Sequence, residues 1–190
     1  MKFFQKVNMA SESIDSYMRS GIVYDAQGEN PIEANGGDLV VPASVITNAV
    51  YGEPDENMFM FKAPAANGGL NANLFILDPV KVPEATNGDL VYRMGVRTLG
   101  LKVNAGELIA ARKLDLNDQF LVGVENLGLT AVPAVGEYYG ISDGAVEHAK
   151  IADIASTTGY AARVDAIRKI SQGIGKKGLV DAVLLTVVRI

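Results

Sequence analysis

The chain has 190 residues, of which 48% are hydrophobic, so it can bury the core of one ordinary domain. Its formal net charge is −5 and it carries no block of Lys and Arg, so its long-range field repels a phosphate backbone and a nucleic-acid partner is not expected. The absence of cysteine excludes disulfides and thiolate metal sites. No apolar run reaches the roughly 20 residues of a membrane helix and no signal-peptide core follows the N-terminus, so we expect a soluble, non-exported protein with no membrane partner.

Residues 1–20 are predicted to form an extended N-terminal arm, and residues 21–190 a single β-rich domain. The first twelve residues mix apolar side chains with Lys, Gln and Asn too irregularly to bury themselves, so we expect the apolar ones to contact another surface. These predicted interface residues are Phe3, Phe4, Val7 and Met9. Ser13 can cap a short helix that ends before Gly21.

Residues 21–64 are rich in Gly, Pro, Asn and acidic residues, which predicts short strands joined by long loops. Asn-Gly pairs at 35–36, 67–68 and 87–88 mark tight reversals into following strands. The first and third of these pairs lead into similar Gly-Asp-Leu-Val sequences, a similarity too short to establish a repeat.

The stretch from Leu90 to Asn126 predicts a meander of antiparallel strands. Apolar and polar residues alternate along 90–97, and the alternation changes phase near Thr98, where we expect a bulge or a corner. The rest of the meander is predicted as a strand over 108–113, a polar corner over 114–118 and a strand over 119–125.

Residues 145–156 predict a helix, because their apolar side chains fall close to one side, Asp143 can cap it and no Gly or Pro interrupts it. The following segments, 160–170 and 179–190, predict a hairpin around a glycine-rich turn. The second of them is apolar on both faces and should be covered on both. Residues 160–170 also fit helical spacing, so strand and helix both stay open there. The fold class expected is mainly β, an antiparallel sandwich or barrel-like fold with one or two short helices and the N-terminal arm.

The motif Gly173-Ile174-Gly175-Lys176-Lys177-Gly178 has the form of the dinucleotide fingerprint. The residues that follow it are strand-like and leave no room for the second strand and ribose-binding acid that the fingerprint requires. We therefore expect the tip of a flexible hairpin here and predict no cofactor.

His148 is the only histidine, and no second His stands at ligand spacing, so zinc chemistry is not expected and the side chain is placed on the surface of the predicted helix. Asp115, Asn117 and Asp118 match the beginning of a calcium loop, but the glycine required at its sixth position is absent. A polar turn explains them better. No catalytic residue and no metal site are predicted.

Arg93, Arg97 and Arg112 are placed on the polar faces of neighbouring strands. They form either a basic strip for an acidic partner or a solvated sheet face. Tyr138 and Tyr139 either anchor an interface or pack in the core. The predicted interface therefore adds Arg93, Arg97, Tyr138 and Tyr139 to the four residues of the arm.

An apolar arm, long Gly/Pro/Asn loops, short β segments, no Cys or Trp and an apolar final strand together resemble the small structural proteins of tailed-bacteriophage virions. The chain is most similar in style to head decoration or capsid-stabilising proteins. The resemblance implies a non-enzymatic homo-oligomer, possibly a trimer, that binds a capsid or other virion protein and is assembled in the host bacterial cytoplasm. A tail-tube or head-tail connector subunit, and a β-rich ligand-binding module or enzyme, are the alternatives.

Overall fold

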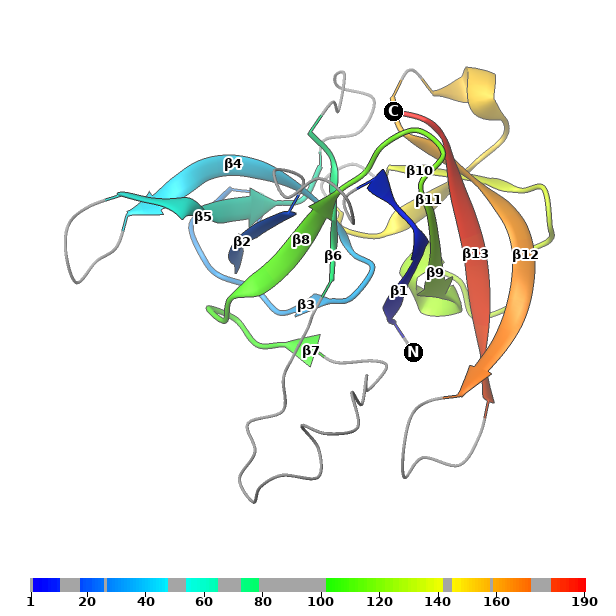
Figure 1. Cartoon of the computed structure of the whole chain (residues 1–190), viewed down its shortest axis with the longest axis horizontal. Helices are drawn as coiled ribbons and strands as arrows, with labels where there is room; N and C mark the ends of the chain where they lie inside the picture. Colours follow the sequence, from blue (N-terminus) through cyan, green and yellow to red (C-terminus); the bar gives the residue numbers. More distant parts are fainter. Residues whose placement is uncertain are drawn as a thin grey trace.

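The computed structural model describes residues 2–10, 18–25, 27–47, 54–64, 73–78, 102–141, 145–157, 159–171 and 179–190. Strands make up 56% of the structure and helices 6%, which confirms the mainly β class. The strands form a closed barrel beside a six-stranded sheet (Figure 1). In the described ranges, no helix is long and apolar enough to cross a membrane.

Every pairing in the six-stranded sheet is antiparallel. In spatial order, its strands are β1 (Phe4–Asn8), β9 (Gln119–Gly123), β13 (Leu179–Arg189), β12 (Ala161–Ser171), β10 (Tyr138–Ile141) and β11 (His148–Ile151). The long β12–β13 hairpin curves along the side of the molecule away from the barrel (Figure 1).

The barrel closes through one parallel pair, β2 with β5, and four antiparallel pairs. Its strands in order around the wall are β2 (Met18–Val23), β5 (Pro54–Lys62), β4 (Leu39–Thr47), β6 (Phe75–Leu77) and β8 (Ile109–Lys113). A two-stranded sheet of β3 (Ala34–Asn35) and β7 (Lys102–Val103) accompanies it.

Two barrel strands, β4 and β6, form the wall between the barrel interior and the six-stranded sheet. Successive side chains of a strand point to opposite faces, so Val40, Phe75 and Leu77 fill the barrel. Leu39 and Ile76, on the opposite face of the same strands, join the core formed with the six-stranded sheet. The two β units are therefore packed through a shared apolar layer.

The hairpin predicted at the end of the sequence is confirmed, and residues 161–171 are a strand rather than a helix. Val183 and Leu185 of β13 lie in the core that faces the barrel, while Ala182 and Leu184 lie in a smaller cluster on the other face. Residues 182–187 are all buried, so the last strand is covered on both faces as expected.

The second half of the predicted meander is also confirmed, with β8 and β9 joined by a polar turn. The first Asn-Gly turn leads into β4 as expected. The segment 90–97, the corner near Thr98, and the turns at 67–68 and 87–88 lie outside the described residues.

The helix predicted over 145–156 is wrong. Residues 148–151 form β11, which pairs with β10, and only Ile154–Ser156 turn as a short 3-10 helix, η4. Pairing with a sheet edge satisfies the backbone of this segment and overrides its helix-like spacing. The helix predicted to end before Gly21 is contradicted over 18–20, which belong to β2.

The extended N-terminal arm is not confirmed. Residues 4–8 are β1, the strand at one edge of the six-stranded sheet, paired with β9. Phe3, Phe4 and Met9 are 2%, 8% and 3% exposed, so the chain itself covers these apolar side chains.

Gly21 is required where β2 lies between β5 and β8 in the barrel wall. A Cβ at this position would lie 2.1 Å from the carbonyl oxygen of Phe59 and 2.6 Å from Cε2 of Phe61. Gly21→Ala is expected to lower the free energy of unfolding by about 1–3 kcal/mol, because the barrel strands must separate to admit the methyl group. Urea denaturation measures this effect. Ser20→Ala on the same strand is the control, and equal stability of both variants contradicts the close approach.

Candidate functional site

Three of the buried polar residues of the described chain, Asp38, Asn126 and His148, lie where the barrel meets the six-stranded sheet. The turn between β3 and β4 enters this junction as Asn35-Gly36-Gly37-Asp38. The Asp38 carboxylate accepts hydrogen bonds from the backbone N–H and the side-chain amide of Asn35 at 2.9 and 3.3 Å. Gly37 has a φ of +87°, and a Cβ there would lie 2.8 Å from Nδ2 of Asn126 and 2.9 Å from the carbonyl oxygen of Phe3. The turn therefore needs glycine both for its conformation and for space.

Asn126 is the polar centre of the junction and is fully buried. It belongs to the short 3-10 helix η3 (Val124–Leu127), which follows β9 directly. Its Oδ1 accepts hydrogen bonds from the backbone N–H groups of Phe3, at 2.9 Å, and Gly123, at 3.1 Å. Its Nδ2 donates to the carbonyl oxygen of Gly36 at 2.9 Å. One side chain thus connects the N-terminal segment, the sheet and the barrel turn.

Lys2 adds an ion-pair cluster at the same place. Its Nζ lies 2.6 Å from Oε1 of Glu147 and 3.6 Å from Oδ1 of Asp38. Burial opposes the charge of Lys2, but the hydrogen bond to Glu147 and the nearby Asp38 carboxylate outweigh it, so the pKa of Lys2 is raised. Burial raises the pKa of Asp38, although Lys2 acts against the shift.

His148 lies in the core rather than on a helix surface, which corrects the sequence-based expectation. It is 2% exposed, and its ring packs against the rings of Phe120 and Tyr160 at centroid distances of 6.3 and 5.9 Å. Nδ1 is 3.4 Å from the Tyr160 hydroxyl, while Nε2 has no hydrogen-bond partner among the described residues. Burial lowers the pKa of His148 to about 4. The imidazole is therefore neutral at pH 7.

The turn between β8 and β9 is a structural turn, as expected. Both oxygens of the Asp118 carboxylate are occupied by backbone N–H groups, Oδ1 by that of Ala10 at 2.7 Å and Oδ2 by that of Asp115 at 2.8 Å. Asn117 takes a left-handed φ of 69° there. In the part of the chain that the structure describes, no group of three or more His, Cys, Asp or Glu is arranged to hold a metal ion.

Arg112 is not on a solvated sheet face, which corrects its predicted placement. Its Nε lies 2.6 Å from Oδ2 of Asp78, and each residue is 6% exposed. A buried arginine and carboxylate must be paired to offset the loss of solvation, so this pair serves the folded state.

The predicted interface residues have different environments in the structure. Phe3, Phe4 and Met9 are core residues, and Val7 is 40% exposed. Tyr139 is buried and donates a hydrogen bond from its hydroxyl to Glu137 at 3.1 Å, whereas Tyr138 is half-buried. Arg93 and Arg97 lie outside the described residues.

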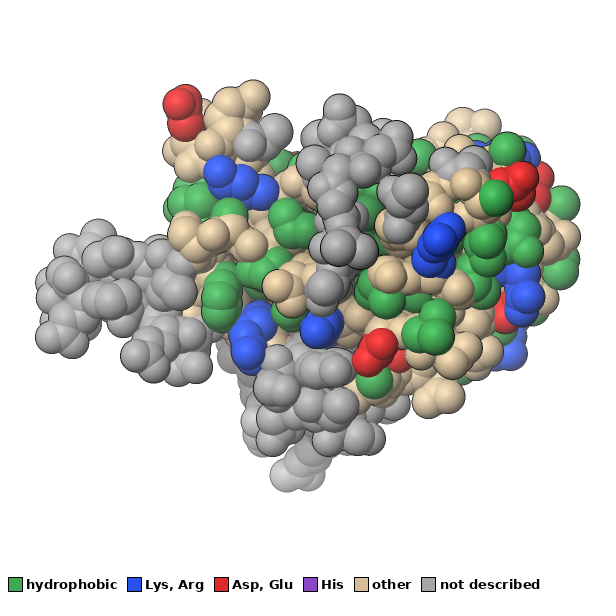
Figure 2. Space-filling model, turned by 90° about the horizontal axis from the view of Figure 1, so that it is seen from above, with side chains coloured by type: hydrophobic (Ala, Val, Ile, Leu, Met, Phe, Trp, Pro, Cys, Tyr) green, Lys and Arg blue, Asp and Glu red, His purple; other side chains and the backbone are tan. Residues whose placement is uncertain are grey.

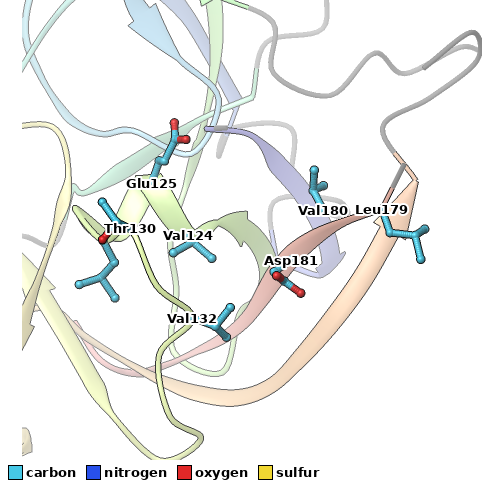
Figure 3. Close-up of a pocket in the computed structure, with 8 residues that line it drawn as sticks. Val124, Glu125, Thr130, Val132, Leu179, Val180 and Asp181 are labelled. Carbon is cyan, nitrogen blue, oxygen red and sulfur yellow. The ribbon is translucent and has the colours of Figure 1, made fainter. Parts of the chain in front are cut away.

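A pocket of about 500 Å³ opens between the segment after β9 and the first residues of β13. Figure 3 shows Val132 on the loop side reaching toward Asp181 on the strand side. The lining residues are Val124, Glu125, Leu129, Thr130, Val132, Leu179, Val180 and Asp181. Sequence reasoning missed this pocket, although the apolar residues of the Gly- and Pro-containing loop after Asn126 were a signal.

No known family model matches the chain, and neither a curated protein nor a solved structure shows significant similarity to it.

Removal of the Asn126 carboxamide tests the importance of the junction. Asn126→Ala removes the buried partner of the Phe3 N–H and of the Gly36 carbonyl oxygen, and leaves the Gly123 N–H only its 3.4 Å bond to the Phe3 carbonyl oxygen. We therefore expect the free energy of unfolding to fall by about 3 kcal/mol. Asn104→Ala, at an exposed turn, is the matched control and should change stability by less than about 1 kcal/mol. Urea denaturation of both variants measures the difference in the free energy of unfolding. Similar losses of stability in the two variants would contradict a special role of the Asn126 hydrogen bonds.

His148 predicts a specific pH dependence. The unfolded chain binds a proton near the ordinary pKa of 6.5, but the folded chain does so only near 4, so stability should fall as the pH is lowered from 6.5 to 4. The shift corresponds to about 3 kcal/mol at about 1.4 kcal/mol per unit. His148→Gln and His148→Phe remove the titrating group and should flatten this part of the stability curve. An unchanged slope in both variants would contradict the prediction.

Proposed function

We propose that the chain is a non-enzymatic structural protein of a tailed-bacteriophage virion, which binds and stabilises the capsid as a decoration or accessory head protein. It self-associates in this role, and its site of action is the virion. The proposal rests on the resemblance in layout and composition, together with the way in which the structure uses its polar and apolar groups.

The use of the described polar groups supports a structural role. His148, the only histidine in the chain, is sealed among aromatic rings and offers no base to a substrate at the surface. The carboxylate of Asp118 binds backbone N–H groups, and that of Asp78 pairs with Arg112. These groups hold elements together and present no convergent set to solvent.

The observation that carries the proposal is the set of large apolar side chains left exposed on a well-packed β scaffold. Figure 2 shows hydrophobic side chains reaching the surface on both the barrel side and the sheet side, among Lys, Arg, Asp and Glu. The exposed ones are Val7, Met18, Leu108, Leu116, Val132, Val135, Ile154 and Leu179. Exposed apolar side chains give such a subunit surface to bury against its neighbours.

Cosedimentation tests the proposed capsid binding. The major capsid protein encoded in the same genome is assembled into empty shells, and purified protein is added in increasing amounts. We expect saturable recovery of the protein in the shell pellet and its appearance as surface density by electron microscopy. A protein that stays in the supernatant at all concentrations would overturn the capsid proposal.

Electron microscopy of the protein alone separates the decoration role from the tail-tube or connector alternative. A tail or connector subunit forms closed rings without a shell, whereas a decoration protein forms small oligomers that order only on the capsid lattice. Rings that do not bind shells would favour the alternative.

A further inference from the structure

Three side chains at the junction bring an amine, a buried carboxyl group and a base together. Lys2 precedes β1, Asp38 precedes β4 and Glu147 precedes β11, so three separate segments of the chain supply them. The Nζ atom of Lys2 lies 3.6 Å from Oδ1 of Asp38 and 2.6 Å from Oε1 of Glu147. Reacting atoms that are ready to form a bond lie about 3–3.5 Å apart, so the amine needs little movement to reach the Asp38 carboxyl group.

The Asp38 carboxyl group is arranged for attack at its carbon atom. Its Oδ2 accepts hydrogen bonds from the backbone N–H and the side-chain amide of Asn35, at 2.9 and 3.3 Å. Its Oδ1, the oxygen that faces Lys2, is buried and has no hydrogen-bond partner in the described part of the chain. Two donors at one oxygen stabilise the negative charge that develops there when a nucleophile adds to the carbon. Oδ2 is therefore prepared to become an oxyanion, and Oδ1 to leave.

The amine must be neutral and the carboxyl group protonated for the two to condense. Burial raises the pKa of Asp38, which favours its neutral acid form. Burial opposes the charge of Lys2, but its carboxylate partners raise the pKa of Lys2, so a base must take its proton. Glu147 is hydrogen-bonded to Nζ and is the group placed to do so.

Asp38, rather than Glu147, is the carboxyl group suited to attack. The Glu147 side chain is 44% exposed, whereas that of Asp38 is 1% exposed. Surrounding water favours hydrolysis of an amide over its formation, and a closed site excludes that water. The dry carboxyl group with a donor pair at one oxygen is therefore the acceptor, and the wet one exchanges protons.

We propose that Lys2 and Asp38 condense into an intramolecular isopeptide bond, with Glu147 as the base. Glu147 takes one proton from the Lys2 ammonium, and Nζ attacks Cγ of the protonated Asp38, so that an Nζ–Cγ bond forms. The Cγ–Oδ1 bond then breaks, and Oδ1 leaves as water with a proton released by the nitrogen. In sum, an ammonium and a carboxylate become an amide and one water, and no oxidant, reductant or cofactor is needed. This inference goes beyond the proposed function and does not depend on it.

The bond joins the beginning of the chain to the turn that enters the barrel at β4. Strand β1 lies at an edge of the six-stranded sheet and pairs there only with β9. An edge strand is held by one neighbour, so it is among the first elements to separate when a sheet opens. A covalent link at Lys2 keeps this strand beside the junction.

Mass spectrometry of the denatured full chain tests the bond. We expect the wild-type mass to be lower than the mass calculated from the sequence by one water molecule. A tryptic digest should contain a branched peptide that joins Lys2 to the peptide with Asp38. Lys2→Arg keeps the positive charge but supplies no amine, so it should have the full calculated mass. Lys6→Arg, on β1, is the matched control and should lose water like wild type.

Glu147→Gln tests the base, because an amide cannot accept the proton from Lys2. We expect condensation to slow by about a hundredfold or more, measured in samples denatured at successive times after cell-free synthesis. Circular dichroism confirms that each variant is folded. A wild-type chain of full calculated mass, a loss of water that persists in Lys2→Arg, or a branch at another residue would each overturn the inference. Equal rates in Glu147→Gln and wild type would overturn the role of Glu147.

Discussion

The whole arrangement depends on one buried carboxamide, that of Asn126, which lies where two β units and the beginning of the chain converge. Its three hydrogen bonds join residues that are far apart in the sequence, Phe3, Gly36 and Gly123. Apolar packing between the barrel wall and the sheet stabilises their contact but does not by itself fix their relative orientation, because burial of apolar surface is not directional. Hydrogen bonds in a dry junction have strict geometry, so Asn126 fixes how the two units are oriented.

The junction and the pocket differ in what they can do. At the junction, Lys2 forms ion pairs with Glu147 and Asp38, and aromatic rings enclose His148, so these side chains contact one another rather than solvent or a ligand. At the pocket, apolar side chains and carboxylates face outward on a surface that the described part of this chain leaves open. The junction therefore stabilises the fold from within, whereas the pocket is open at the surface.

Sequence patterns predicted the elements that depend on local rules. The apolar faces of residues 179–190 required cover on both sides, and Asn-Gly at 35–36 required a reversal, because both follow from side-chain chemistry alone. The helix at 145–156 failed because a short alanine-rich segment fits either period, and its pairing with β10 cannot be seen locally. Asn126 was not found for a related reason. Its partners are dispersed along the chain, and nothing in the sequence distinguishes a buried asparagine from one in an exposed turn. The closure of the barrel through the parallel β2–β5 pair could not be predicted from the sequence either.

The position of β13 between β9 and β12 has a consequence for biosynthesis. During translation, β1 and β9 can meet once residue 123 has left the ribosome, but β9 then has a bare edge until the final strand is made. Unpaired strand edges pair readily with other chains, and pairings between residues distant in the sequence form slowly. The partly synthesised sheet therefore exposes the unpaired edge of β9, where other chains can pair, until β13 takes its place.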